Sequence, residues 1–261
     1  MTSTHRPNKS LGQNFLIDTR VQQRIVDACG LLPTDTVIEI GPGKGAITSL
    51  LLPKVQQLIA VEKDHALADA LKINFKQDNL QVIDGDFLKL DIQELPDELV
   101  VVGNIPYYIS TPIIEKILAN KKKIKRAYMT VQLEFGERLG ALVGNRDYGS
   151  LSCFVQYHAD VKVLFKISPG SFSPQPKVSS CFLSLMIKDH PVVEAKDEDK
   201  LFKLIQRSFM QRRKTIANSL KGLIEQERLL ALFAKLGIDP QSRAENLTLL
   251  NYIELSNCLV I

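Results

Sequence analysis

The stretch Val101-Val102-Gly103-Asn104-Ile105-Pro106-Tyr107-Tyr108 decides the fold of this chain and the chemistry expected of it. The apolar residues 99–102 predict a short buried strand, which ends at Gly103 and opens into a loop. The first side chain of this loop is the amide of Asn104, which offers both a donor and an acceptor. In open α/β sheets, ligands bind at the carboxyl ends of the strands, which is where this amide is expected to lie.

The rest of the loop combines a proline with two aromatic residues. Pro106 has no N–H and biases Ile105 away from helix, so the carbonyl of Ile105 or of Pro106 can point into a pocket. Tyr107 supplies a flat face. Acceptors beside an aromatic plate suit the exocyclic amine of a flat heterocycle such as adenine. The alternative is a buried strand followed by an ordinary proline turn.

A glycine-rich turn, Gly41-Pro42-Gly43-Lys44-Gly45, follows the β-branched strand predicted at 36–40 and precedes a predicted helix. In this βα unit, glycines such as Gly41 and Gly43 let a ligand approach the backbone. Ala46 stands where the NAD fingerprint needs its third glycine, and the turn lacks the Lys-Ser/Thr ending of a P-loop. Together with Glu39 before the turn, these features favour S-adenosyl-L-methionine over NAD or ATP.

Acidic residues end the next two predicted strands. Glu62 lies about 20 residues after Gly41, a position suited to the two ribose hydroxyls of a bound nucleoside. Asp86 follows the strand at 80–83 and can accept a hydrogen bond from the adenine amino group of the cofactor, with Phe87 beside the ring. The alternatives are a surface charge at a strand end and an ordinary Asp-Gly loop. All these motifs fall at strand ends in sequence order, which favours a single site.

Two prolines stiffen a later loop, Ser171-Phe172-Ser173-Pro174-Gln175-Pro176, which carries Phe172 at its mouth. An exposed phenylalanine on a rigid loop is costly unless a ligand covers it. The alternative is that Phe172 anchors the loop in the core. Before this loop, residues 151–167 predict one long strand or a pair of strands.

The apolar pattern breaks at the charged residues 190–199, where we place a domain boundary. We expect a domain at 1–189 that binds the cofactor and a small all-helical domain at 190–261 that binds RNA. The helical domain carries a dense basic face, formed by Arg207, Arg212, Arg213 and Lys214. We favour contacts to RNA phosphates for this face over a merely solvated surface.

The composition limits the remaining possibilities. With 33 Lys and Arg against 29 Asp and Glu, the net charge of +4 is compatible with nucleic acid. No apolar run approaches the ~20 residues of a membrane span, and the first residues lack the apolar segment of a signal peptide, so we expect a cytoplasmic protein. The Cys and His residues form no cluster with metal-ligand spacing, so we expect reduced thiols and no metal. No long exposed apolar helix is evident, and we expect a monomer.

These motifs resemble those of the bacterial small-subunit rRNA adenine dimethyltransferase family, known for kasugamycin sensitivity. The resemblance rests on Asn-Ile-Pro-Tyr and on three further segments, Leu-Gly-Gln-Asn-Phe-Leu at 11–16, Asp-Tyr-Gly-Ser-Leu-Ser at 147–152 and Gln-Arg-Arg-Lys-Thr at 211–215. It implies an α/β fold with the Rossmann-like sheet of class I S-adenosylmethionine-dependent methyltransferases. It also implies dimethylation at N6 of two adjacent adenines near the 3′ end of 16S rRNA in the small-subunit precursor, and a role in ribosome biogenesis.

The resemblance also assigns roles to residues. An N-terminal arm, residues 1–16, would fold over the cofactor and contact it through Asn14 and Leu16. Tyr107 and Phe172 would sandwich the flipped adenine. The chain departs from the family pattern at Leu133, where a lysine is usual, and at Lys44, where an apolar residue is usual.

The expected mechanism is a direct in-line attack of the adenine amine on the sulfonium methyl, with acceptors on both amine hydrogens and no carboxylate base. Two rival functions stay open. One is the antibiotic-resistance enzyme that dimethylates an adenine of large-subunit rRNA. The other is a non-catalytic RNA-binding assembly or transcription factor on the same scaffold, against which the intact Glu62, Asp86 and Asn104 argue.

Overall fold

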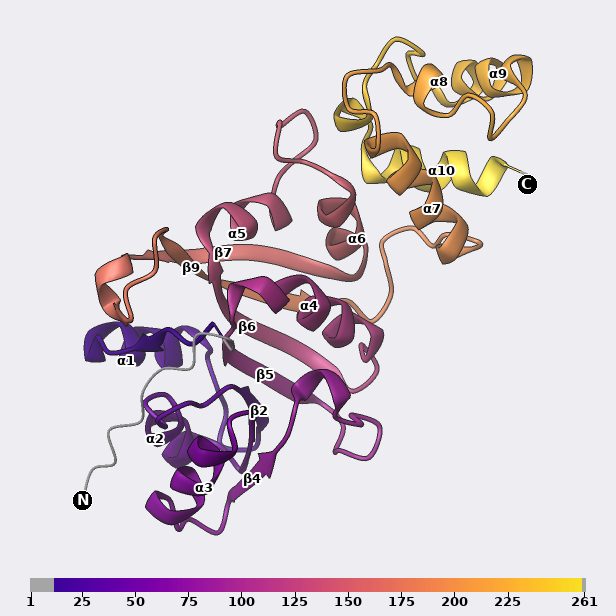
Figure 1. Cartoon of the computed structure of the whole chain (residues 1–261). Coiled ribbons are helices and arrows are strands. Elements are labelled where there is room, and N and C mark those ends of the chain that lie inside the picture. Colours follow the sequence, from indigo (N-terminus) through magenta and orange to yellow (C-terminus); the bar gives the residue numbers. More distant parts are fainter. Residues whose placement is uncertain (1–11, 260–261) are drawn as a thin grey trace. The chain divides into compact units, whose positions relative to one another are not determined.

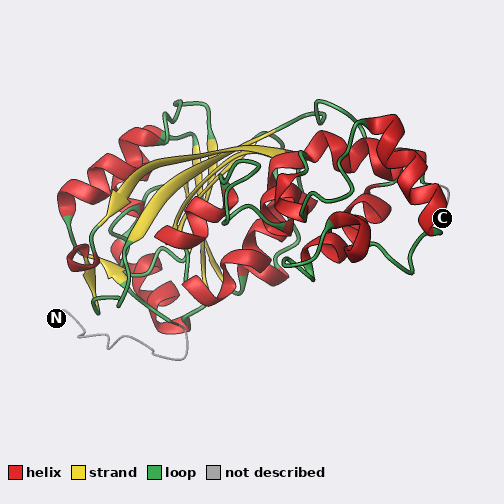
Figure 2. Ribbon diagram, turned by 90° about the horizontal axis from the view of Figure 1, so that it is seen from above, coloured by secondary structure: helices red, strands yellow, loops and turns green. Residues whose placement is uncertain are grey.

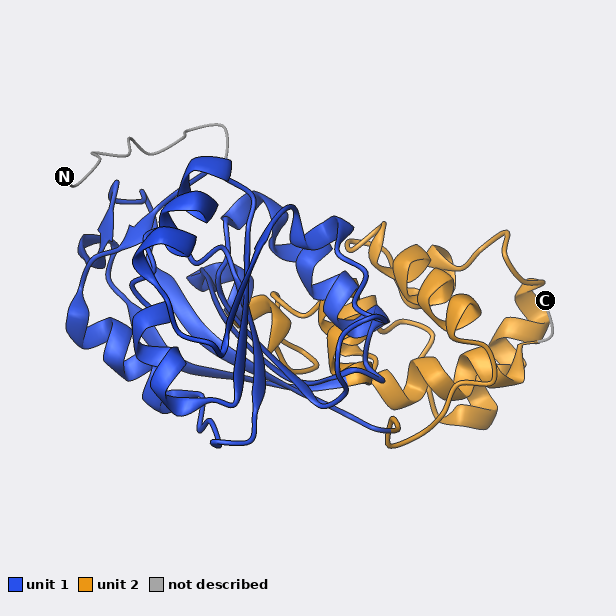
Figure 3. Ribbon diagram, turned by 90° about the horizontal axis from the view of Figure 1, so that it is seen from below, with its two compact units in different colours: residues 1–136, 159–189 blue, residues 137–158, 190–261 orange. Residues whose placement is uncertain are grey.

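A computed structural model describes residues 12–259 of the chain. The chain forms two compact units, one made of Met1–Gly136 and Ala159–Asp189, the other of Glu137–His158 and His190–Ile261 (Figure 3). One break falls between Asp189 and His190, where the apolar pattern of the sequence changes. Residues 137–158, which the sequence placed in the first domain, instead pack with the second unit.

The first unit is built on a twisted sheet with helices packed beside it (Figures 1 and 2). The sheet has seven strands in the order β4-β3-β2-β5-β6-β9-β7. Strands β2 to β6 pair in parallel, whereas β9 lies antiparallel between β6 and β7. The Rossmann order is therefore modified by one antiparallel strand inserted near the edge. The strands are β2 (Thr36–Ile40), β3 (Gln57–Glu62), β4 (Leu80–Asp84), β5 (Leu99–Asn104), β6 (Ile124–Gln132), β7 (Ala159–Ile167) and β9 (Ser180–Ile187).

Both faces of this sheet are buried at its central strands β2, β3 and β5, which are apolar almost throughout. Val37 and Val100 point to one face and pack with residues of the helices α1 and α2. Ile38 and Val101, one residue further along each strand, point to the other face and are fully buried as well. Continuous apolar runs of this kind are typical of parallel sheets covered by helices on both sides.

Two helices of this unit, α1 and α3, begin at aspartate caps, whereas α2 and α4 have no side-chain cap. The Asp18 side chain accepts hydrogen bonds from the N–H groups of Arg20 and Val21 at the start of α1, and Asp64 does the same for α3. The helices are α1 (Thr19–Ala28), α2 (Thr48–Leu51), α3 (His65–Asn74) and α4 (Ser110–Ala119), with 3₁₀ turns η2 (Leu52–Lys54), η3 (Phe87–Lys89), η4 (Tyr107–Ile109) and η5 (Pro169–Ser171); α5 (Leu133–Leu139) spans the boundary between the units.

A two-stranded sheet brings the N-terminal segment to the proline-rich loop. Strand β1 (Phe15–Leu16) pairs antiparallel with β8 (Phe172–Ser173), with Leu16 opposite Phe172. The Ile17 N–H extends this contact by donating to the Ser171 carbonyl at 2.8 Å. These bonds hold residues 15–17 in place beside the main sheet.

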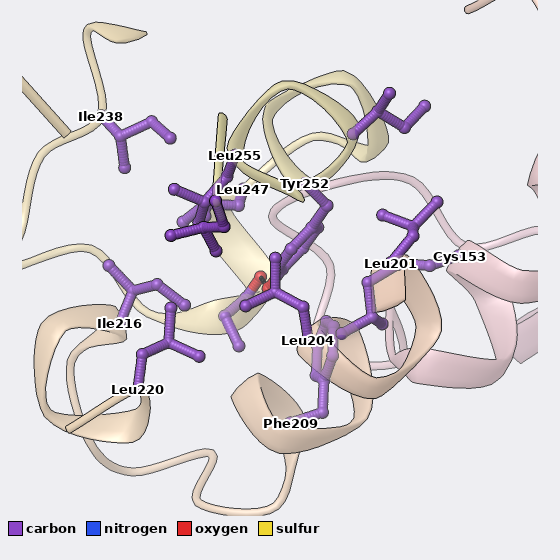
Figure 4. Packing of buried hydrophobic residues seen from close by; sticks show 14 of the residues in the cluster. Cys153, Leu201, Leu204, Phe209, Ile216, Leu220, Ile238, Leu247, Tyr252 and Leu255 are labelled. Carbon is purple, nitrogen blue, oxygen red and sulfur yellow. Dashed lines mark hydrogen bonds between the residues drawn. The ribbon is translucent and has the colours of Figure 1, made fainter. Parts of the chain in front are cut away.

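The second unit is helical, with α6 (Ser150–His158), α7 (Glu198–Phe209), α8 (Ile216–Ser219), α9 (Gln226–Leu236), α10 (Leu249–Cys258) and a 3₁₀ turn η6 (Ala244–Asn246). Its core gathers Leu204, Phe209 and Tyr252 (Figure 4). The strand predicted over residues 151–158 is wrong. This segment is α6, because its side chains Cys153 and Tyr157 join the helical core and not the sheet. Within residues 12–259 no helix has the length and apolar character that a membrane crossing requires.

Candidate active site

A cavity of about 470 Å³ opens at the carboxyl ends of β2, β3 and β5 in the first unit. Its walls come from the segment at residues 12–17, the glycine turn, η3 and η4. Nearly all the predicted cofactor and catalytic residues line it, namely Asn14, Leu16, Glu39, Gly41, Gly43, Glu62, Asp86, Phe87, Asn104, Ile105, Pro106 and Tyr107. The fold therefore brings together residues that are far apart in the sequence.

Phe172 is the exception among the predicted site residues. Its side chain is 3% exposed, packs in the hydrophobic cluster with Tyr128 and Phe182, and does not line the cavity. Ser173 lines the cavity instead, because successive side chains of a strand point to opposite sides. The expected sandwich of Tyr107 and Phe172 is therefore not formed in this structure, and Phe172 is the core anchor of its loop.

Glu62 is a buried carboxylate fixed by backbone donors. Its Oε2 accepts from the Gly43 N–H at 2.9 Å and its Oε1 accepts from the Asp64 N–H at 2.8 Å. Burial raises the pKa of Glu62, while these backbone hydrogen bonds oppose the shift. Each carboxylate oxygen has a second lone pair, so the group can accept two further hydrogen bonds from neighbouring hydroxyls.

Glu39 lies deeper, below the glycine turn. Its Oε2 accepts a hydrogen bond of 2.7 Å from the Thr48 hydroxyl, and the residue is 3% exposed. Burial raises the pKa of Glu39 to about 7; hydrogen bonds from Thr48 oppose this shift and the charge of Glu62 adds to it. Because Thr48 begins α2, this bond ties the end of β2 to the helix after the turn.

Aromatic rings pack against the glycine turn at Gly43 and Gly45, which leaves little room for a side chain at either position. Gly45 has a φ of 80°, and a Cβ atom there would lie 2.5 Å from the Phe75 ring. A Cβ atom at Gly43 would meet the Phe15 ring at 3.1 Å. The unusual Lys44 is exposed, and its Nζ lies 5.1 Å from the centre of the same Phe15 ring. This cation–π contact joins the turn to the N-terminal segment.

Asp86 is held in its ionised form at the end of β4. Its Oδ1 accepts from the Leu88 N–H at 2.9 Å, and its Oδ2 accepts from the Lys63 ammonium at 2.8 Å. Burial acts to raise the pKa of Asp86, but these hydrogen bonds and the Lys63 charge lower it below its usual value. Phe87, the next residue, is 4% exposed and adds an apolar wall.

The loop after β5 presents two acceptors. The Asn104 Nδ2 donates to the Asn14 carbonyl at 2.9 Å, which fixes the amide and leaves its Oδ1 without a donor among the described residues. The Pro106 carbonyl already accepts from the Ile109 N–H at 3.1 Å. No donor in the described part of the chain reaches the Ile105 carbonyl. Of the two carbonyls that the sequence left open, Ile105 is therefore the freer acceptor.

Tyr107 forms the aromatic wall beside these acceptors. Its ring is half-buried, and its hydroxyl shares a hydrogen bond of 2.6 Å with the Ser180 hydroxyl on β9. Burial raises the pKa of Tyr107, so the side chain stays a neutral phenol near neutral pH. Tyr108, its neighbour, is 60% exposed and also lines the cavity.

Sequence reasoning missed three supporting residues. They are Gln22, which donates to the Leu16 carbonyl at 2.8 Å, Lys63 beside Asp86, and Ser180 beside Tyr107. Only Lys63 could have been suspected from the sequence, because it follows Glu62 directly. The contacts of Gln22 and Ser180 depend on the folded chain. Within residues 12–259 no group of three or more His, Cys, Asp or Glu side chains could hold a metal ion.

The basic face lies in the second unit and divides into two kinds of residue. The Arg212 guanidinium donates to the carbonyls of Arg146 and Tyr148, the latter at 3.2 Å, and so holds the loop before α6. Arg213 and Lys214 are exposed, and no acid among the described residues pairs with them. Arg207, in the last turn of α7, is half-buried. Arg212 is thus an anchor within its own unit, which the sequence did not predict.

Comparison with known proteins gives similarity over nearly the whole chain. A family model described as ribosomal RNA adenine dimethylase matches residues 4–260. Ribosomal RNA small subunit methyltransferase A of Clostridium botulinum is 40% identical over 257 residues, which cover 97% of this chain and 94% of that protein. The crystal structure of a dimethyladenosine transferase from Plasmodium falciparum matches with a TM-score of 0.82 and 26% identity, covering 92% of this chain and 95% of that one. The 23S rRNA methyltransferase ErmE matches with a TM-score of 0.75, also at 26% identity, covering 93% and 98%.

Proposed function

We propose, because the chain belongs to the ribosomal RNA adenine dimethylase family, that it dimethylates N6 of two adjacent adenines near the 3′ end of 16S rRNA. The methyl donor would be S-adenosyl-L-methionine and the partner the precursor of the small ribosomal subunit. The relative from Clostridium botulinum, a small-subunit methyltransferase by name, supports this choice of subunit. We further propose a monomer that acts in the cytoplasm during ribosome biogenesis.

One observation carries the catalytic part of this proposal: two acceptors without a donor among the described residues lie beside an aromatic ring in the cavity. They are the Asn104 Oδ1 and the Ile105 carbonyl, next to Tyr107. An adenine amine has two hydrogens and a lone pair that is delocalised into the ring. Hydrogen bonds from both hydrogens to these acceptors draw the nitrogen toward a tetrahedral geometry and localise its lone pair for attack.

The cavity fits the cofactor by the chemistry of its donors and acceptors. Glu62 keeps two acceptor positions for the ribose hydroxyls, and the ionised Asp86 can accept from the adenine amino group. Phe87 supplies an apolar wall, and Asn14 and Leu16 close the cavity from the N-terminal side. When bound, S-adenosyl-L-methionine supplies an electrophilic methyl group.

The residues around the amine do not need to include a base. The amine nitrogen becomes acidic once it carries the new methyl group, so it can lose its proton directly to water. The target base must leave its stack to reach the cavity, and stacking on Tyr107 would offset part of that cost. In the second unit, Arg207, Arg213 and Lys214 are proposed to contact RNA phosphates.

Transfer of a labelled methyl group to three substrates tests the function. The substrates are unmethylated small subunits, unmethylated large subunits and naked duplex DNA, with the nucleosides separated after digestion. We expect N6,N6-dimethyladenosine from small subunits alone. Label in large subunits would move the chain to the activity of the 23S enzyme, whose fold it shares. RNA binding without transfer would favour an assembly factor.

A further inference from the structure

The hydroxyl of Tyr107 is tied to a distant and rigid part of the sheet. Its hydrogen bond to the Ser180 hydroxyl measures 2.6 Å and joins residues 73 positions apart. Ser180 is 0% exposed and is the first residue of β9, where it pairs with Gln132 of β6 on one side and Ile167 of β7 on the other. The partner of the tyrosine is therefore fixed by strands on both sides.

Tyr107 itself sits on a much less constrained element. It begins the 3₁₀ turn η4, which has three residues and no side-chain cap. Short 3₁₀ turns have poorer hydrogen-bond geometry than α-helices, so the turn alone fixes the ring weakly. A second bond at the far end of the side chain restricts both of its torsion angles.

The orientation of the Tyr107 ring decides where a stacked base would lie in this site. Phe172, the other ring expected to hold a target base, is buried in the core at 3% exposure. Of the two predicted stacking rings, only Tyr107 lines the cavity that also contains the acceptors Asn104 and Ile105. A base stacked on Tyr107 meets those acceptors only if the plane of the ring is set correctly, since positioning errors of about 1 Å are costly in catalysis.

We propose that Ser180 is a positioning residue, which holds the Tyr107 ring at the angle that directs the amine of a stacked adenine toward Asn104 and Ile105. The proposal rests on the function proposed above. Ser180 does not line the cavity, so it acts through Tyr107 alone.

A double-mutant cycle tests the pair. Ser180→Ala and Tyr107→Phe each remove one partner, and we expect each to lower kcat/KM for small subunits about three- to tenfold, the range of a single hydrogen bond. The fall should appear in kcat, because RNA affinity depends chiefly on phosphate contacts. The double variant should be no worse than either single one. Ser180→Thr keeps the hydroxyl and should retain activity, and cofactor affinity measured by calorimetry should not change in any variant.

A spectroscopic readout follows the ring without catalysis. The six tyrosines can be replaced by 3-fluorotyrosine, and Tyr107→Phe then identifies the ¹⁹F resonance of Tyr107 by its loss. We expect Ser180→Ala to shift and broaden that resonance, and Ser180→Thr to leave it sharp. The resonances of the remaining tyrosines serve as the internal control for correct folding.

Three results for Ser180→Ala would overturn the proposal. The first is a wild-type kcat/KM with an unchanged Tyr107 resonance. The second is a lower melting temperature with no other change. The third is a loss of activity that adds fully to the loss caused by Tyr107→Phe. If the wild-type protein transfers no methyl group to small subunits while Ser180→Ala still broadens the resonance, the proposed function is wrong. The role of Ser180 in holding the Tyr107 ring is then confirmed.

Discussion

At the scale of single residues, the side-chain amide of Asn104 serves both as a hydrogen-bond donor and as an acceptor. Its nitrogen holds the Asn14 carbonyl and thereby the N-terminal wall of the cavity, and its oxygen has no donor within residues 12–259. A carboxylate at this position could still accept but could not donate to a carbonyl. The amide thus links the N-terminal wall of the cavity to the loop after β5.

Replacing Asn104 by alanine removes both the donor and the acceptor of the amide. We expect Asn104→Ala to lower kcat by at least about a hundredfold, the cost of losing one preorganised polar contact to a reacting group. Cofactor affinity should fall only a few-fold, because Glu62 and Asp86 remain. Single-turnover methyl transfer and calorimetry with S-adenosylhomocysteine measure the two effects, with Asn218→Ala, an exposed residue of the second unit, as the control. Full activity of Asn104→Ala would refute the mechanism.

Glu39 offers a second test, through the pH dependence of stability. Its pKa in the folded protein is about 7, against 4.5 for an ordinary glutamate. Between these values the folded state binds more protons than the unfolded state, so stability falls as the pH rises through this window. Glu39→Gln keeps an acceptor for Thr48 but cannot ionise. It should therefore lack this loss, which is of the order of 3 kcal/mol at pH 8.

Urea unfolding of both proteins at several pH values between 5 and 8 measures the effect. We expect the free energies of unfolding to diverge in favour of Glu39→Gln as the pH rises. Glu134→Gln, at an exposed position, should follow the wild-type curve. Parallel curves for wild type and Glu39→Gln would show that the buried carboxyl keeps an ordinary pKa.

At the scale of elements, the glycine turn is held by its neighbours as well as by its own backbone angles. Gly45 combines a positive φ with the Phe75 ring, which occupies the space a Cβ atom would need. Gly237 ends α9 with a φ of 65° and has no atom within 4 Å of such a Cβ position. The two glycines therefore share the backbone strain of a substitution and differ in its steric cost.

This pair gives a matched prediction. Gly237→Ala should cost about 1 kcal/mol of stability from the left-handed backbone alone. Gly45→Ala should cost about 1–3 kcal/mol more, the usual range for overpacking. It should also weaken cofactor binding, because α3 must move away from the turn. Phe75→Leu combined with Gly45→Ala should recover part of the difference in urea unfolding, and equal costs for both glycines would contradict the steric account.

The elements also show where local sequence patterns fail. The strands β2, β3 and β5 are mainly apolar runs that end near a Gly or an acid, and the sequence predicts them well. Residues 151–158 have a similar apolar and aromatic composition, yet they form α6, because the second unit buries Cys153 and Tyr157. Composition in such a short segment does not separate a strand from a buried helix, and the tertiary environment decides.

At the scale of the whole molecule, the order of the motifs predicts the sheet and the position of the cavity. Parallel strands place their carboxyl ends along one edge of the sheet, so polar residues that end successive strands lie close together. This can be predicted without knowing the conformations of the loops. The burial of Phe172 and the hydrogen bond between Ser180 and Tyr107 could not be predicted in this way. Both depend on which side of a strand faces the core, and on contacts between segments more than 70 residues apart.

The charge of the molecule leads to a prediction about the salt dependence of RNA binding, which compares the neighbouring residues Arg212 and Arg213. A cation that contacts an RNA phosphate releases counterions, so its removal lowers the salt dependence of binding, by about 0.7–0.9 in the logarithmic slope. Arg212 and Arg213 are both exposed and unpaired by any described acid, but only Arg212 donates to the carbonyls of Arg146 and Tyr148. Arg213→Gln should lower the slope for small-subunit RNA and leave the melting temperature unchanged. Arg212→Gln should lower the melting temperature, because the loop before α6 loses a hydrogen-bond donor, and it should lower the slope less than Arg213→Gln does, because two carbonyls hold its guanidinium. Arg213→Lys, which keeps the charge, should bind as the wild type does. Equal salt slopes for Arg212→Gln and Arg213→Gln, with unchanged melting temperatures, would show that both arginines contact phosphates.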